Sequence, residues 1–145
     1  MRTICSLGCA LLMACSLATM ARSQAKSPGE KPVESEHTKG PNGWEGWTLK
    51  SSIPGDPPGG DKYPFTLVIA RNGKIVRQID GDPFVWNWIF WADGKQVAYE
   101  SGPLHFGMSC ILADIESGRQ LGMVDCYHEL PDNAPEWAVK VESAR

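Results

Sequence analysis

Two cysteines and two histidines in the second half of the chain have types and spacing that could do chemistry. The cysteines are Cys110 and Cys126, and the histidines are His105 and His128. Cysteine and histidine ligate zinc and copper, so the four side chains could converge on one metal ion. Their spacing matches no zinc finger, however, and a pair of cysteines in an exported chain favours a disulfide. The disulfide is therefore the first interpretation, the metal site is the alternative, and no cofactor is expected.

The turn between the two cysteines decides whether they can bond. A three-residue loop at Ser117–Arg119 would place Cys110 directly opposite Cys126 in a hairpin. A cross-strand disulfide at that position would stabilise the fold by roughly 2–4 kcal/mol.

Enzyme chemistry has little support in the residue pattern. The sequence contains no Gly-x-Ser-x-Gly, no phosphate-binding loop and no His-Glu-x-x-His. A nucleophile, a base and an orienting group must be brought together by the fold, and no such set can be named. The acidic residues Asp56, Asp80 and Asp82 fit turns. We expect no enzyme activity and assign no catalytic residue.

The amino-terminal segment is typical of a secretory signal. Arg2 precedes an uncharged, largely apolar run over 3–21, and Ser23-Gln24-Ala25 offers the small residues at −3 and −1 that signal peptidase requires. We predict a signal peptide over 1–25 and a secreted or periplasmic location. An uncleaved membrane anchor and lipidation at Cys15 are the alternatives, and only this segment would contact a membrane.

The remaining 120 residues divide into a linker and one domain. Without Arg2 and Arg22, the 14 basic residues fall to 12 against 17 acidic ones. These charges are scattered, which excludes nucleic acid as a partner because phosphate binding needs clustered Lys and Arg. Residues 26–43 are rich in Pro, Gly, Ser and charge, and predict a disordered linker. Residues 44–145 predict a single domain.

The pattern of that domain is β. Apolar strands flank Asn72-Gly73 and Asp93-Gly94, the dipeptides that favour tight hairpin turns, and Gly118 marks a third turn. The last candidate strand is 136–142. We predict an all-β antiparallel meander of about seven or eight strands with incomplete propeller-like or sandwich-like packing.

Aromatic side chains crowd the strands around Asp93-Gly94. A turn there places Phe90 opposite Val97 and Trp88 opposite Tyr99, and alternation puts Phe84 and Trp86 on the same face. An apolar face of this size must be covered. The other hairpins would cover it, with Trp44, Trp47 and Trp137 from the ends of the domain. Alternatively, part of the aromatic surface is open to a partner.

The segments on either side of this turn resemble the TolB-type, WD-like β-propeller repeat. The resemblance rests on "WADGKQVAY", residues 91–99, and on Asp114 followed by Ser117, Gly118 and Arg119. It implies a four-residue loop over 115–118, in which case the cysteines miss each other by three positions and would need a β-bulge to bond. A closed propeller needs at least four blades of about 40 residues, and this chain has room for fewer than three.

Three functions compete on this evidence. The first is a non-enzymatic protein-interaction module that binds a protein partner or a second copy. The second is a small-ligand protein, for instance for carbohydrate, that uses Trp44, Trp47 or Trp137 as stacking platforms. The third is a metal or redox protein built on His105, Cys110, Cys126 and His128.

Overall fold

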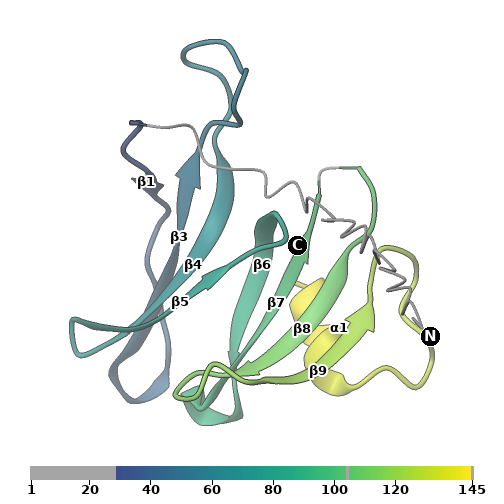
Figure 1. Ribbon diagram of the computed structural model, residues 1–145. Helices are drawn as coiled ribbons and strands as arrows, with labels where there is room; N and C mark the ends of the chain where they lie inside the picture. The colour runs from purple at the N-terminus through teal and green to yellow at the C-terminus, as the bar shows by residue number, and fades with distance from the viewer. Residues whose placement is uncertain (1–28, 104, 145) are drawn as a thin grey trace, which may run out of the picture.

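The computed structural model describes residues 29–103 and 105–144, and within them it forms two antiparallel sheets and one α-helix (Figure 1). Sheet 1 contains β1 (Val33–Glu34), β2 (Thr38–Lys39), β3 (Trp44–Ser51), β4 (Tyr63–Arg71) and β5 (Lys74–Asp80). Sheet 2 contains β6 (Phe84–Trp91), β7 (Gln96–Gly102), β8 (Ser109–Asp114) and β9 (Gln120–Asp125). The helical segments are η1 (Pro41–Gly43), η2 (Ala92–Gly94) and α1 (Glu136–Glu142). The predicted all-β antiparallel meander is confirmed. The predicted signal at 1–25 lies outside the described residues.

The main core lies between the two sheets. Alternate residues of β4, such as Leu67 and Ile69, point toward sheet 2 and are fully buried. They meet Val97 and Tyr99 of β7, with Trp88 and Phe90 packed alongside. Most of the aromatic surface that the sequence places around Asp93-Gly94 is therefore covered by sheet 1.

The hairpin turns follow the local sequence. Asn72 and Gly73 both have positive φ, as a tight turn of this kind requires. Around Asp93 and Gly94 the expected register is confirmed, with Phe90 opposite Val97 and Trp88 opposite Tyr99. Between β8 and β9 the loop spans 115–118, because the Asp114 N–H bonds to the Arg119 carbonyl.

A bulge in β6 changes the face assigned to its first residues. Val85 pairs with Ser101 and Trp88 pairs with Tyr99, so two residues, Trp86 and Asn87, stand opposite Glu100 alone. Val85 therefore joins Trp88 in the inter-sheet core, whereas alternation had placed Phe84 and Trp86 on that face. The Asn87 amide donates to the buried Glu100 carboxylate, and this hydrogen bond stabilises the bulge.

The segment 136–142 is a helix, and its prediction as a strand is wrong. Trp137, Ala138 and Val141 are buried, a spacing that forms one helical face, and they pack on the outer face of sheet 2 (Figure 1). The helix begins after Pro135, its N-cap residue, whose backbone is still extended. No helix among the described residues is long and apolar enough to span a membrane.

The described part of the expected linker also differs from the prediction. Within residues 29–43, β1 and β2 both pair with β3, and the His37 ring stacks on Trp47 with 4.1 Å between centroids. The Glu45 carboxylate accepts a hydrogen bond from Lys39, which holds the pKa of Glu45 below its usual range. The segment is poor in apolar residues, but it acquires order by covering the indole that β3 presents. Residues 26–28 lie outside the described part.

The turn after β8 carries a pH prediction. Ser117 donates to the Asp114 carboxylate from its hydroxyl at 2.6 Å and its N–H at 2.8 Å, which lowers the pKa of Asp114. A lowered carboxyl pKa stabilises the fold above the ordinary carboxyl range, and this stability is lost as the pH falls through the lowered pKa. We expect Asp114→Asn to melt below the wild type at pH 7 and to differ less in strong acid. Equal differences at both pH values in thermal melts would contradict the charged interaction.

Candidate functional sites

The three tryptophans named as interaction platforms in the alternative interpretation are buried, so that alternative is wrong, whereas the expected place of Trp44 in the cover of the aromatic face is confirmed. Trp44, Trp47 and Trp137 are 5%, 7% and 8% exposed. Trp44 packs in the inter-sheet core, with the Arg71 guanidinium carbon 5.2 Å from its ring centroid. His37 covers Trp47, and sheet 2 covers Trp137. An indole that is 8% exposed or less offers little surface on which a ligand could stack. Sequence alone does not say which face of a strand another segment covers.

Two other tryptophans line a groove. Trp86 and Trp88 of β6 face a space of about 600 Å³ together with Tyr63 and Pro64 of β4. The rest of the lining is polar and comes from the β1–β3 region and from the loop before β4: Ser35, Glu36, Thr38, Thr48, Lys50, Asp61 and Lys62. The sequence reasoning missed this site because it assigned both indoles to the core. The usable signal was that β6 opens the second sheet and so lies at its edge.

The two indoles of the groove are held in place. The Trp86 Nε1–H donates to the Gly102 carbonyl at 2.9 Å, and its ring meets Phe84 edge-on at 5.2 Å. Trp88 meets Phe90 edge-on at 5.4 Å and lies on Gly46, where an added Cβ would stand 2.6 Å from the indole. Both indoles remain half-buried. The groove is therefore a preformed feature of the packing.

The groove is lined by charged groups of both signs. Its lining contributes the carboxylates of Glu36 and Asp61 and the ammonium groups of Lys50 and Lys62. Lys62 is paired with Glu30, and this hydrogen bond is the main cause that lowers the pKa of Glu30. With Lys62 neutralised by Glu30, the groove keeps the carboxylates of Glu36 and Asp61 against Lys50, a small negative excess that disfavours an anionic ligand.

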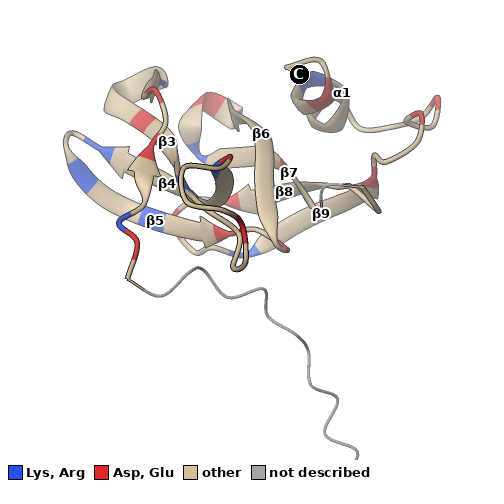
Figure 2. Cartoon of the chain, turned by 90° about the horizontal axis from the view of Figure 1, so that it is seen from above, with Lys and Arg blue, Asp and Glu red and all other residues tan. Residues whose placement is uncertain are grey.

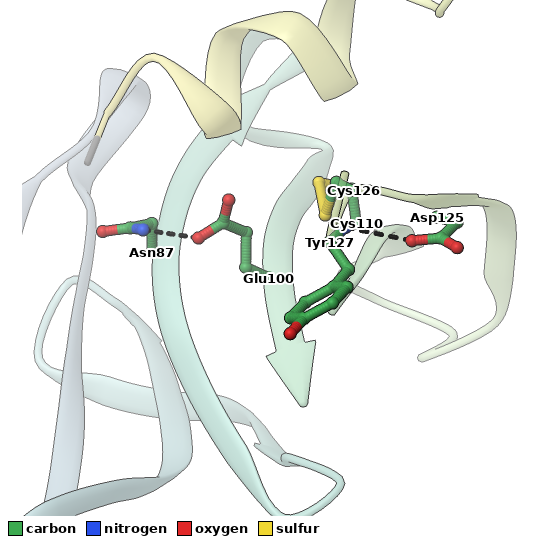
Figure 3. The surroundings of a disulfide bond; sticks show 6 residues. All are labelled: Asn87, Glu100, Cys110, Asp125, Cys126 and Tyr127. Carbon is green, nitrogen blue, oxygen red and sulfur yellow. Dashed lines mark hydrogen bonds between the residues drawn. A yellow bond between two sulfur atoms is a disulfide. The ribbon is translucent and has the colours of Figure 1, made fainter. Parts of the chain in front are cut away.

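Cys110 and Cys126 form a disulfide, with their Cα atoms 5.7 Å apart (Figure 3). Cys110 lies opposite Val124 rather than opposite Cys126. The four-residue loop would have separated the cysteines by three positions, and a bulge between β8 and β9 reduces the offset to two. The chain turns after Asp125, where the Tyr127 N–H bonds to the Asp125 carboxylate, and this turn helps to bring Cys126 back to its partner.

Glu100 accompanies the disulfide in the interior. Its side chain is fully buried and lies directly opposite Cys110 in the β7–β8 ladder. A carboxylate oxygen of Glu100 and the two sulfurs lie within 4.8 Å of one another, and Figure 3 shows Asn87 on the other side of the carboxylate. The sulfurs are bonded to each other, so neither carries the thiolate charge that ligates a metal.

The predicted four-residue metal cluster does not assemble in the described structure. His105 and His128 are both exposed on loops, whereas Cys110 and Cys126 are fully buried. The His105 carbonyl accepts a hydrogen bond from the Tyr127 hydroxyl, and the His128 ring packs against the Tyr127 ring. Within residues 29–103 and 105–144, the group whose ligand atoms converge contains Glu100 in place of either histidine.

Comparison with known proteins gives no relative from which a role could be transferred. The chain matches no family model, no curated protein and no solved structure.

Proposed function

We propose that the chain is an exported, non-enzymatic protein-interaction module that binds through the open edges of its sheets. The observation that carries the proposal is the apolar surface on β5 and β9. Sheet 1 ends at β5 and sheet 2 ends at β9, and neither has a further strand partner among the described residues. Exposed large apolar side chains lie on both strands: Ile75, Val76, Leu121 and Met123.

Met123 carries the argument furthest. It stands opposite Ile111, which packs against the inter-sheet core, so Met123 lies on the same face of sheet 2. Sheet 1 does not extend far enough to cover it, and Met123 is 61% exposed. An apolar side chain beside a free strand edge suits a partner that adds a strand and covers the side chain at the same time.

Two further features support this interpretation. Two meanders in succession agree with the proposal that the sheets are TolB-like blades, and α1 covers the outer face of sheet 2, where a third blade would pack. Both basic and acidic residues occur on the strands and loops of the chain (Figure 2), so a strongly charged partner is not favoured. The disulfide supports an extracytoplasmic location, because such bonds persist in oxidising compartments.

The proposal is tested with Met123→Lys. We expect the wild-type protein to bind a dye that reports exposed apolar surface, and to self-associate in sedimentation experiments over the micromolar range. A buried lysine charge would oppose pairing, so the variant should associate at least about tenfold more weakly, or about 1.4 kcal/mol.

The matched control is Val139→Lys. Val139 is also an exposed apolar residue, but it lies on α1, away from both edges. Its lysine variant should associate like the wild type. A wild-type protein that stays monomeric and binds no dye would overturn the proposal, and so would equal effects of the two variants.

A further inference from the structure

The groove beside β6 combines two kinds of surface. One wall offers the half-buried indoles of Trp86 and Trp88, and the opposite wall offers hydroxyl and charged groups from the β1–β3 region. We propose that this groove is a binding site for a neutral saccharide. The inference goes beyond the protein-interaction function, which uses β5 and β9.

The indoles supply the stacking surface. A sugar ring has one face of C–H groups, which packs on a flat aromatic ring, and a rim of hydroxyls, which needs polar partners. Trp86 is held by its hydrogen bond to the Gly102 carbonyl, and Trp88 lies on Gly46. Binding would therefore order few side chains, which lowers its entropic cost. Trp91, at the other end of β6, packs instead near α1 and is not part of the groove.

The polar wall decides the class of ligand. Hydroxyls of Thr38 and Thr48, carboxylates of Glu36 and Asp61, and the Lys50 ammonium group all line the groove. They offer donors and acceptors of both kinds, and the two carboxylates against this one ammonium group leave only a small negative excess. A phosphate or a polyanion would meet two carboxylates, and a purely apolar ligand would leave the polar groups without water. A neutral polyhydroxylated ligand satisfies both walls.

The size of the groove agrees with this class. A space of about 600 Å³ lies within the range of small-ligand sites, about 300–1,000 Å³. It is formed by segments far apart in sequence, since Thr38 stands on β2, Tyr63 on β4 and Trp86 on β6. A ligand in the groove should therefore contact both the segment around β2 and sheet 2.

The test is titration of the purified protein with cellobiose, maltose and chitobiose, followed by calorimetry and by tryptophan fluorescence. We expect at least one of them to bind with a dissociation constant of about 1 mM or lower. Trp86→Ala and Trp88→Ala should each weaken binding by about tenfold or more. No binding of any of the three disaccharides by the wild type overturns the proposal, and so does binding that neither variant weakens.

A second pair of variants keeps the test valid if an indole cannot be removed without unfolding. Thr38→Arg fills the groove from an exposed position on β2 and should abolish binding. Gln78→Arg adds the same side chain at an exposed position of β5, outside the groove, and should bind like the wild type. Equal affinities of the two arginine variants would refute the site.

Two further arms separate the inference from its rivals. An acidic disaccharide with one uronate should bind more weakly than the neutral ones, and equal or tighter binding contradicts the charge argument. Met123→Lys should leave saccharide binding unchanged, because Met123 is not among the lining residues. If the wild-type protein binds a disaccharide but does not self-associate, the saccharide site is supported and the proposed binding through the sheet edges is contradicted.

Discussion

Replacing Trp137 with alanine should lower the free energy of unfolding by about 3–5 kcal/mol, the usual cost of deleting a buried indole. Trp137 is the largest side chain that α1 buries, and it packs on the outer face of sheet 2. Gly122 of β9 marks how close the contact is, since an added Cβ there would lie 3.1 Å from the indole. Without Trp137, α1 retains only Ala138 and Val141 to bury. Urea denaturation followed by circular dichroism measures the effect.

Val139→Ala is the control for this prediction. Val139 is on the same helix but is 44% exposed, so its truncation should change the stability by only about 0.5 kcal/mol. If the two variants lose similar stability, α1 does not pack on sheet 2 through Trp137. If Trp137→Ala also abolishes cooperative unfolding, the outer face of sheet 2 depends on this helix as its cover.

The same helix shows why the sequence prediction failed there. Trp137, Val139 and Val141 alternate with smaller or polar residues, a pattern typical of a strand. In the structure, Val139 is exposed and Ala138 is buried, which is the helical spacing. Seven residues fit both periods. Only the presence of an uncovered sheet face nearby selects the helix, and that information is not local.

Hairpins could be predicted because their signals are local. Asn72-Gly73 and Asp93-Gly94 need positive φ, and the register on either side of Asp93-Gly94 follows from the turn. The bulge in β6 could not be predicted in this way. The bulge accompanies a hydrogen bond from Asn87 to Glu100, a fully buried carboxylate, and both are set by the tertiary packing rather than by the local sequence.

The candidate sites also differ in whether local sequence signals could predict them. The disulfide was predicted from two cysteines and an expected compartment, although the bulge that lets it form was foreseen only as a condition. The alternative that used Trp44, Trp47 and Trp137 as platforms is wrong, because all three indoles are buried. That alternative placed Trp44 and Trp47 in the open at the start of the domain, but β2 and η1 precede them and return over β3. The groove along Trp86 and Trp88 is created by that return.

Removal of the disulfide should cause the second large loss of stability. The double variant Cys110→Ala, Cys126→Ala should lose about 3 kcal/mol, as expected for a loop that closes 16 residues apart in sequence. Both cysteines are fully buried beneath α1, so a small loss of packing adds to the loss of the cross-link. Chemical denaturation of the variant gives the effect, and the wild type denatured in excess dithiothreitol gives an independent estimate.

The comparison between these two measurements also tests where the stability resides. If cross-linking dominates, the reduced wild type and the alanine variant should agree within about 1 kcal/mol, whereas a variant that is as stable as the oxidised wild type would contradict the role of the bond.

Cys110, Cys126 and Trp137 belong to one buried cluster, so their effects should not add. When α1 has already been loosened by Trp137→Ala, the cross-link beneath it has less native packing to hold together. A double-mutant cycle should therefore give a coupling of about 0.5–3 kcal/mol. A coupling of zero would mean that α1 and the disulfide stabilise sheet 2 independently, and α1 would then not depend on the cross-linked strands as its base.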